Sequence, residues 1–136
     1  MKDIQQRGNA LMLICVCLSG LAFAKSNTTT TLSSSLNPST YGATVKFTAT
    51  VTPSAATGTV TFKDGSTTLG TGTLSSGKAT YSTSTLAVGS HSIAAVYGGD
   101  SNYNGSTSSA LTQTVNKANS TTTVASSRTR PRSVLL

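Results

Sequence analysis

The sequence of 136 residues contains few of the side chains from which catalytic and metal sites are built. It has no glutamate and no tryptophan, and its acidic residues are Asp3, Asp64 and Asp100. His91 is the sole histidine. A nucleophilic triad needs a histidine oriented by an acid beside an activated serine, and the sequence has no Gly-x-Ser-x-Gly turn that would expose one. This inventory argues against an enzyme, and we predict no catalytic residue and no cofactor.

Cysteine is equally scarce, and its two copies lie close together near the start of the chain. Cys15 and Cys17 both fall within the apolar run 11–24. From residue 25 onward the sequence has no cysteine, which excludes a disulfide framework and a cysteine-based metal site from that part. We therefore expect a hydrophobic core to hold the fold together, since a unit of about 90 residues is large enough to build one.

The apolar run has the features of a secretory signal peptide. Lys2 and Arg7 precede it, and it ends in Ala22-Phe23-Ala24, which places small residues at the −3 and −1 positions of a cleavage site. We predict a signal peptide over residues 1–24 and export to the cell surface or medium. A membrane anchor is the alternative, but a spanning helix needs roughly 20 apolar residues, and this run is shorter. No membrane span is expected after cleavage.

Negative charge is scarce as well, which leaves a formal net charge of +7. The positive charges do not form a stripe. Residues 25–115 carry four lysines and two aspartates, a net charge of +2, whereas Arg128, Arg130 and Arg132 cluster in the last nine residues. Nucleic-acid-binding proteins usually show a continuous basic surface, often with aromatic rings that stack on bases. We therefore predict no nucleic-acid partner.

Serine and threonine are abundant, with 48 of the 136 residues, and threonine suits a half-exposed strand. Apolar and polar residues alternate along the chain, as they do along residues 43–51, where Val45, Phe47 and Val51 share one face. Asp64-Gly65 is a hairpin signal, and Gly70 with Gly72 indicates an edge strand or a bulge. Strands are predicted at 28–32, 43–51, 58–62, 67–74, 78–83, 90–97 and 109–115.

Seven short strands with turns every 8–12 residues predict an all-β fold, an Ig-like Greek-key β-sandwich of about seven strands. Each strand carries only a few apolar residues on one face, and a sandwich buries such faces against each other. The predicted inward-facing residues are Val45, Phe47, Val51, Val60, Phe62, Tyr81, Ile93, Tyr97, Leu111 and Val115.

The sequence also repeats itself. Residues 25–35 read KSNTTTTLSSS and residues 117–127 read KANSTTTVASS, so seven of eleven positions are identical at an offset of 92. Such an echo is typical of a modular array. We predict a domain over residues 25–116 and, over residues 117–136, a truncated start of a second repeat followed by a disordered basic tail. A shifted reading frame and a genuine short tail remain the alternatives for residues 128–136.

Three motifs link the sequence to a known family. They are NPSTYGATVKFTATV at 37–51, GTVTFKDG at 58–65 and GSHSIAAVYGGDSN at 89–102. With these motifs, residues 28–115 closely resemble the bacterial Ig-like repeats of group 3. The resemblance implies a non-catalytic extracellular module, a spacer or adhesion unit whose partners are neighbouring repeats. A carbohydrate- or protein-binding module is the alternative function.

The acidic residues give a weak candidate for a metal site. Asp64 lies in a predicted hairpin turn and Asp100 in a predicted loop, and an Ig-like sandwich places these at opposite ends. In a head-to-tail array, Asp64 of one module would therefore face Asp100 and Asn102 of the next. Those oxygens and backbone carbonyls are candidates to bind Ca²⁺ at a junction, since Ca²⁺ takes six to eight oxygen ligands. The simpler interpretation is turn chemistry, for which aspartate and asparagine are suited.

The tyrosines give a second weak candidate. Tyr41 and Tyr103 lie in predicted loops and would stack on sugar rings if their faces were exposed. The alternative is that both pack against their loops and leave only the hydroxyl groups in water. Tyr97 is predicted to be core because it alternates with Ile93. His91 is predicted to have a structural role, with its ring packed and hydrogen-bonded across a corner.

Overall fold

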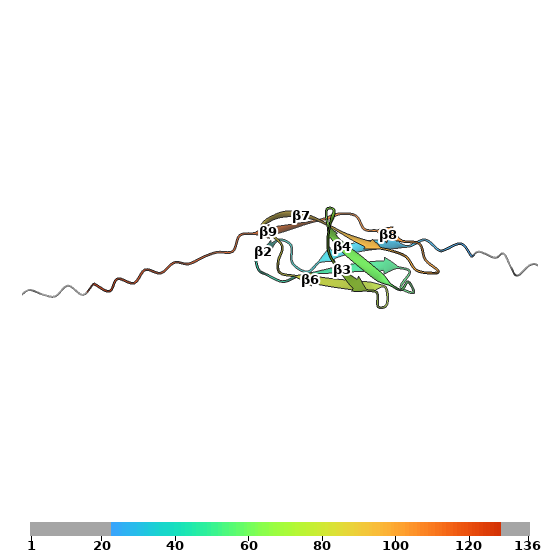
Figure 1. Cartoon of the computed structure of the whole chain (residues 1–136), viewed down its shortest axis with the longest axis horizontal. Coiled ribbons are helices and arrows are strands. Elements are labelled where there is room, and N and C mark those ends of the chain that lie inside the picture. The colour runs from blue at the N-terminus through green and yellow to red at the C-terminus, as the bar shows by residue number, and fades with distance from the viewer. Residues whose placement is uncertain (1–22, 129–136) are drawn as a thin grey trace, which may run out of the picture.

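The computed structural model describes residues 23–128, which form a sandwich of strands with no helix among the residues described (Figure 1). This confirms the predicted all-β class. The strands are β1 (Thr29–Ser34), β2 (Ser39–Thr40), β3 (Val45–Thr52), β4 (Thr59–Asp64), β5 (Thr67–Thr73), β6 (Lys78–Thr83), β7 (Gly89–Tyr97), β8 (Ser106–Thr107) and β9 (Leu111–Asn116).

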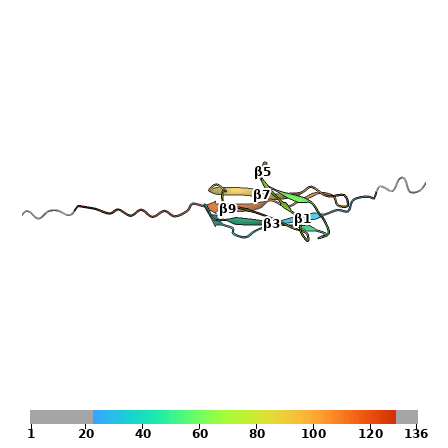
Figure 2. The ribbon, with the colours of Figure 1, turned by 60° about the horizontal axis from the view of Figure 1, so that its bottom comes forward.

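The strands form two sheets that pack face to face. One sheet has the order β1-β3-β6, and the other has the order β2-β9-β7-β4-β5, with β8 paired to β7. Figure 2 shows β5 and β7 in one layer and β1 and β3 in the other. All pairings between these strands are antiparallel except that of β2 with β9. Neighbours in the sheets are often distant in sequence, as expected for a Greek key.

The seven predicted strands are all present, with ends that differ from the predicted ones by at most two residues. The predicted hairpin is confirmed, since β4 ends at Asp64 and β5 begins at Thr67. The sequence did not predict β2 and β8, because a strand of two residues is too short to show alternation.

Alternation along the strands produces one core between the sheets. Phe47 of β3, Phe62 of β4, and Ile93 and Tyr97 of β7 are fully or almost fully buried there. Eight of the ten predicted inward residues are buried. The other two, Tyr81 and Leu111, are half-buried and pack against the core, and the ring of Tyr81 stacks on Phe62 with ring centroids 5.7 Å apart.

The strand β5 is both an edge strand and the site of a bulge, as its glycines predicted. It lies at the end of its sheet, and its pairing with β4 shifts so that Phe62 faces Gly70 while Lys63 faces Thr68. A Cβ atom on Gly70 would lie 2.4 Å from the ring of Tyr81. The lack of side chains at Gly70 and Gly72 therefore lets β5 lie directly against β6 of the other sheet.

The chain enters and leaves the sandwich at opposite ends (Figure 1). Before β1, the backbone of Ser26 bonds to the loop at Asn102 and Asn104. Beyond β9, residues 117–128 run outward from the other end of the sandwich, exposed and without strand pairing. The predicted signal peptide, except for its last two residues, lies outside the described residues, and so do residues 129–136 of the predicted tail.

Candidate functional site

The carboxylate of Asp100 holds together the loop that follows β7. One oxygen, Oδ2, accepts hydrogen bonds from the backbone N–H and the hydroxyl of Thr57, at 2.8 and 2.9 Å. The other, Oδ1, accepts from the backbone N–H groups of Asn102 and Tyr103, at 2.7 and 2.8 Å. These donors, above all the N–H of Thr57, hold the pKa of Asp100 well below its usual range. Asp100 therefore ties its loop to the turn between β3 and β4.

Asp64 makes a different set of contacts at the other end of the sandwich. Its Oδ2 lies 2.6 Å from Nδ1 of His91, and its Oδ1 accepts from the backbone N–H of Ser92 at 3.1 Å. The Nε2 atom of His91 lies 2.8 Å from the carbonyl oxygen of Ala87. Because both partners of the ring are acceptors, the protonated imidazole donates to both. The Ala87 carbonyl, then the Asp64 carboxylate, raise the pKa of His91. The ring thus bridges the corner before β7, the structural role predicted for it.

The two carboxylates lie too far apart along the sandwich to act together. Asp64 is paired with Ile93 in the middle of β7, and its carboxylate bonds to His91 and Ser92 on the side of the strand start, whereas Asp100 lies beyond Tyr97, where β7 ends. Among residues 23–128, no group of three histidine, cysteine, aspartate or glutamate side chains is placed to hold a metal ion. The Ca²⁺ junction of Asp64, Asp100 and Asn102 requires a neighbouring module and stays a prediction.

The tyrosines proposed for sugar stacking also lie at opposite ends. Tyr41 follows β2 and is 56% exposed. Its backbone N–H donates to the carbonyl oxygen of Asn116, the last residue of β9. Tyr103 pairs with Ser26 beside the entry of the chain and packs against the core. Tyr97 is buried, and its hydroxyl donates to the carbonyl of Thr57 at 2.8 Å. Each of the two places therefore has one candidate tyrosine ring rather than a pair, and sugar binding by Tyr41 or Tyr103 stays a prediction.

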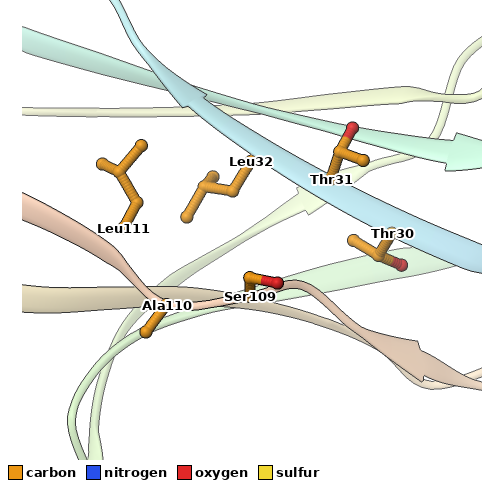
Figure 3. A pocket seen from close by; sticks show the side chains of 6 residues that line it. All are labelled: Thr30, Thr31, Leu32, Ser109, Ala110 and Leu111. Carbon is orange, nitrogen blue, oxygen red and sulfur yellow. The ribbon is translucent and has the colours of Figure 1, made fainter.

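A cavity of about 210 Å³ opens between β1 and the segment that leads into β9 (Figure 3). Figure 3 shows the side chains of Leu32 and Leu111 lying across it from β1 and from β9. Its lining contains no ionisable side chain. The lining residues are Thr30, Thr31, Leu32, Ser109, Ala110 and Leu111.

Side-chain hydrogen bonds cross the sandwich beside this cavity. The hydroxyl of Thr30 lies 2.6 Å from that of Ser106, and the hydroxyl of Ser34 donates to Oε1 of Gln113 at 2.7 Å. Gln113 is fully buried, and its Nε2 donates to the carbonyl of Leu36 at 2.8 Å. Gln113 was not among the residues predicted from the sequence. The sequence pattern that indicates it is a polar residue at an inward position, between the apolar Leu111 and Val115.

Three residues with exposed apolar side chains lie toward the end of the sandwich where β9 leaves. Tyr41 bonds to Asn116 there, and Val88 precedes Gly89, which pairs with Val115. The carbonyl of Leu36 accepts a hydrogen bond from the side chain of Gln113, which belongs to β9. We call Leu36, Tyr41 and Val88 the exit patch, and each of the three is exposed. In a tandem array, this end faces the following module.

Within residues 23–128 no helix is long and apolar enough to cross a membrane. Two sheets that are antiparallel except at β2, a Greek-key strand order and a single shared core define the chain as an immunoglobulin-like β-sandwich module. A family model described as the bacterial Ig-like domain (group 3) matches residues 25–116. The chain therefore belongs to this family, as its motifs predicted.

A solved structure gives the same fold. It is described as "Structures of Clostridium thermocellum CbhA fibronectin(III)-like modules", and it is 21% identical to this chain with a TM-score of 0.52. The match covers 65% of this chain and 94% of that one. Identity at this level supports the fold alone. No curated protein matches the chain significantly.

Proposed function

We propose that this protein is a non-catalytic extracellular structural module, a spacer or display unit that joins neighbouring repeats end to end. The observation that carries this proposal is the placement of the chain ends. Because the chain enters at one end of an elongated sandwich and leaves at the other, each added repeat lengthens the molecule (Figure 1). The repeat offset of 92 residues fits one such module per repeat.

Two further features support this proposal. Bacterial Ig-like modules are typically extracellular and generally non-catalytic, and the predicted signal peptide over residues 1–24 would export the chain. The exit patch gives the following module an apolar surface to contact, which would restrict bending at the junction. Adhesion to a glycan or protein is the alternative, and Tyr41 in this patch is its best-placed residue.

The proposal is tested on a tandem of two copies of residues 25–116 joined at the natural offset. We expect small-angle X-ray scattering to show a maximum dimension close to twice that of one copy. Replacing Tyr41 by serine in the first copy should broaden the distance distribution, because the junction loses an apolar contact. Replacing Tyr41 in the second copy is the matched control and should change nothing. A compact, folded-back tandem would contradict the spacer role.

Export and binding are tested separately. Mass spectrometry of the secreted chain should give an N-terminus at Lys25, whereas a chain retained in the cytoplasm would contradict an extracellular role. A glycan array with the folded module decides the alternative. Binding that is lost in the Tyr41→Ser variant would favour an adhesion module over a spacer.

A further inference from the structure

The chain carries a second version of its own first strand outside the sandwich. Residues 119–127 repeat residues 27–35, which include all of β1. In the structure residues 117–128 are exposed and make no strand pairing, and the side chain of Val124 is 90% exposed. A strand-forming sequence is thus displayed where a second molecule can reach it.

The second version keeps the side chains that β1 turns toward the other sheet. In β1 these are Thr30, Leu32 and Ser34. At the offset of 92 the chain has Thr122, Val124 and Ser126. Both hydroxyl groups that bridge the sheets are therefore present again, one to reach Ser106 and one to reach Gln113.

The flanking contacts of β1 are kept as well. The side chain of Asn27 accepts from Asn104, and the hydroxyl of Thr28 donates to the carbonyl of Asn104 at 2.7 Å. The hydroxyl of Ser35 accepts from the backbone N–H of Lys46 at 3.0 Å. The second version supplies a side chain with the same hydrogen-bonding group at each of the three positions, namely Asn119, Ser120 and Ser127.

The position of β1 makes it easier to replace than a central strand. Among the residues described, its backbone ladder runs only to β3, with six residue pairs from Thr29 to Ser34. Its other edge meets β8 and β9 through side chains, beside the cavity of about 210 Å³. Replacing β1 therefore breaks one ladder, whereas replacing a central strand such as β7 would break several.

The direction of the chain also fits. The second version leaves from the end of the sandwich opposite to the one where β1 begins (Figure 1). A molecule placed in line with the first would receive this segment at its own entry end, running in the direction of its β1. We propose that residues 119–127 of one copy replace β1 on β3 of a second copy, which builds head-to-tail chains of this protein. This inference does not depend on the spacer function.

The incoming segment competes with the β1 strand that is already in place. A strand tethered to its own module acts at an effective concentration in the millimolar range, so it keeps the site when the protein is dilute. Exchange becomes visible when the resident β1 is weakened and the donor segment is left intact. Leu32 and Val124 occupy equivalent positions in the two versions, so aspartate at either position disables one of them.

The test compares full chains with Leu32→Asp, with Val124→Asp and with both changes. The Leu32→Asp chain should form multimers in light scattering, with a Tm that rises over a roughly hundredfold range of protein concentration. The Val124→Asp chain should stay a folded monomer. The double variant should be unfolded at every concentration, because neither version of the strand can bind.

A mixing experiment gives a second, independent readout. The wild-type chain keeps its own β1 and still offers residues 119–127, so it should fold the double variant into a complex of two chains. The Val124→Asp chain should fail to do so. Identical mass and Tm for the Leu32→Asp and doubly substituted chains would overturn the proposal. A folded monomer of Leu32→Asp, or a wild-type chain that fails to fold the double variant, would overturn it equally.

Discussion

The two long edges of the sandwich are closed in different ways. At one edge, Gly72 of β5 lies directly against the backbone of β6, and Gly70 lies against the ring of Tyr81. At the other edge, β1 meets β8 and β9 through hydroxyl and amide side chains beside a cavity. We call these the glycine edge and the hydroxyl edge.

The difference shows how one sandwich combines an edge where the strand is fixed with an edge where the strand can be replaced. The glycine edge depends on close approach of backbones, which only residues without a Cβ allow. The hydroxyl edge depends on side chains of small polar residues, and a second segment with the same residues satisfies them equally well. The predicted strand exchange therefore concerns the hydroxyl edge alone.

The largest effect is expected from a side chain at the glycine edge. In Gly72→Val the Cβ atom would lie 2.7 Å from the carbonyl oxygen of Thr80, so the backbone of β5 or β6 must move. We expect a loss of about 3 kcal/mol in the free energy of unfolding, measured with urea.

Gly98→Ala is the matched control for that substitution. A Cβ atom at Gly98 would meet nothing within 4 Å, so the change should be within about 0.5 kcal/mol. Equal effects of the two substitutions would show that β5 is not held by close backbone approach.

A smaller effect is expected at the hydroxyl edge. Gln113→Leu keeps the size of the buried side chain but removes the closest hydrogen-bond partner of both the Ser34 hydroxyl and the Leu36 carbonyl. We expect a loss of about 2 kcal/mol in urea unfolding. Thr112→Val, on the exposed side of the same strand, is the control and should change little. A Gln113→Leu chain as stable as the wild type would mean that the hydroxyl edge is held by apolar packing alone.

The fold was predictable because its core follows a simple period of two. In β3, Val45, Phe47, Ala49 and Val51 are buried and the residues between them are not, as the alternation requires. Glycines in β5 predicted its edge position because they weaken a strand that must pair on both sides. The two-residue strands β2 and β8 were missed because tertiary pairing, and no local pattern, creates them.

The polar contacts were less predictable because their partners are far apart in the sequence. Gln113 stands 77 residues from Leu36 and 79 from Ser34, and nothing local marks these groups as partners. Asp64 was correctly placed at a hairpin turn, but its contact with His91 spans 27 residues. The sequence showed that Asp100 lies in a loop, and only the structure shows that Thr57 is its largest source of hydrogen bonds.

The smallest expected effect is a dependence of the free energy of unfolding on pH. We expect this dependence to arise at one end of the sandwich and not at the hydroxyl edge. The groups that cross the hydroxyl edge do not titrate, whereas His91 lies at one end with its pKa raised in the folded state, first by the Ala87 carbonyl and then by Asp64. A raised folded pKa stabilises the protein fully below the unfolded value of about 6.5, and this contribution is lost as pH rises through the folded pKa. The free energy of unfolding should therefore decrease as the pH rises from about 6.5 through the folded pKa.

Two substitutions identify the group that makes the free energy of unfolding change with pH, a change that we call the slope. His91→Gln should abolish it, because no titrating group remains at the corner. Asp64→Asn should keep part of it, because the contact of His91 with the Ala87 carbonyl remains. The measurement is urea unfolding at a series of pH values from about 5 to about 8, the range in which histidine is the one side chain that titrates at its ordinary pKa. A slope that survives in His91→Gln would show that the corner is not its origin.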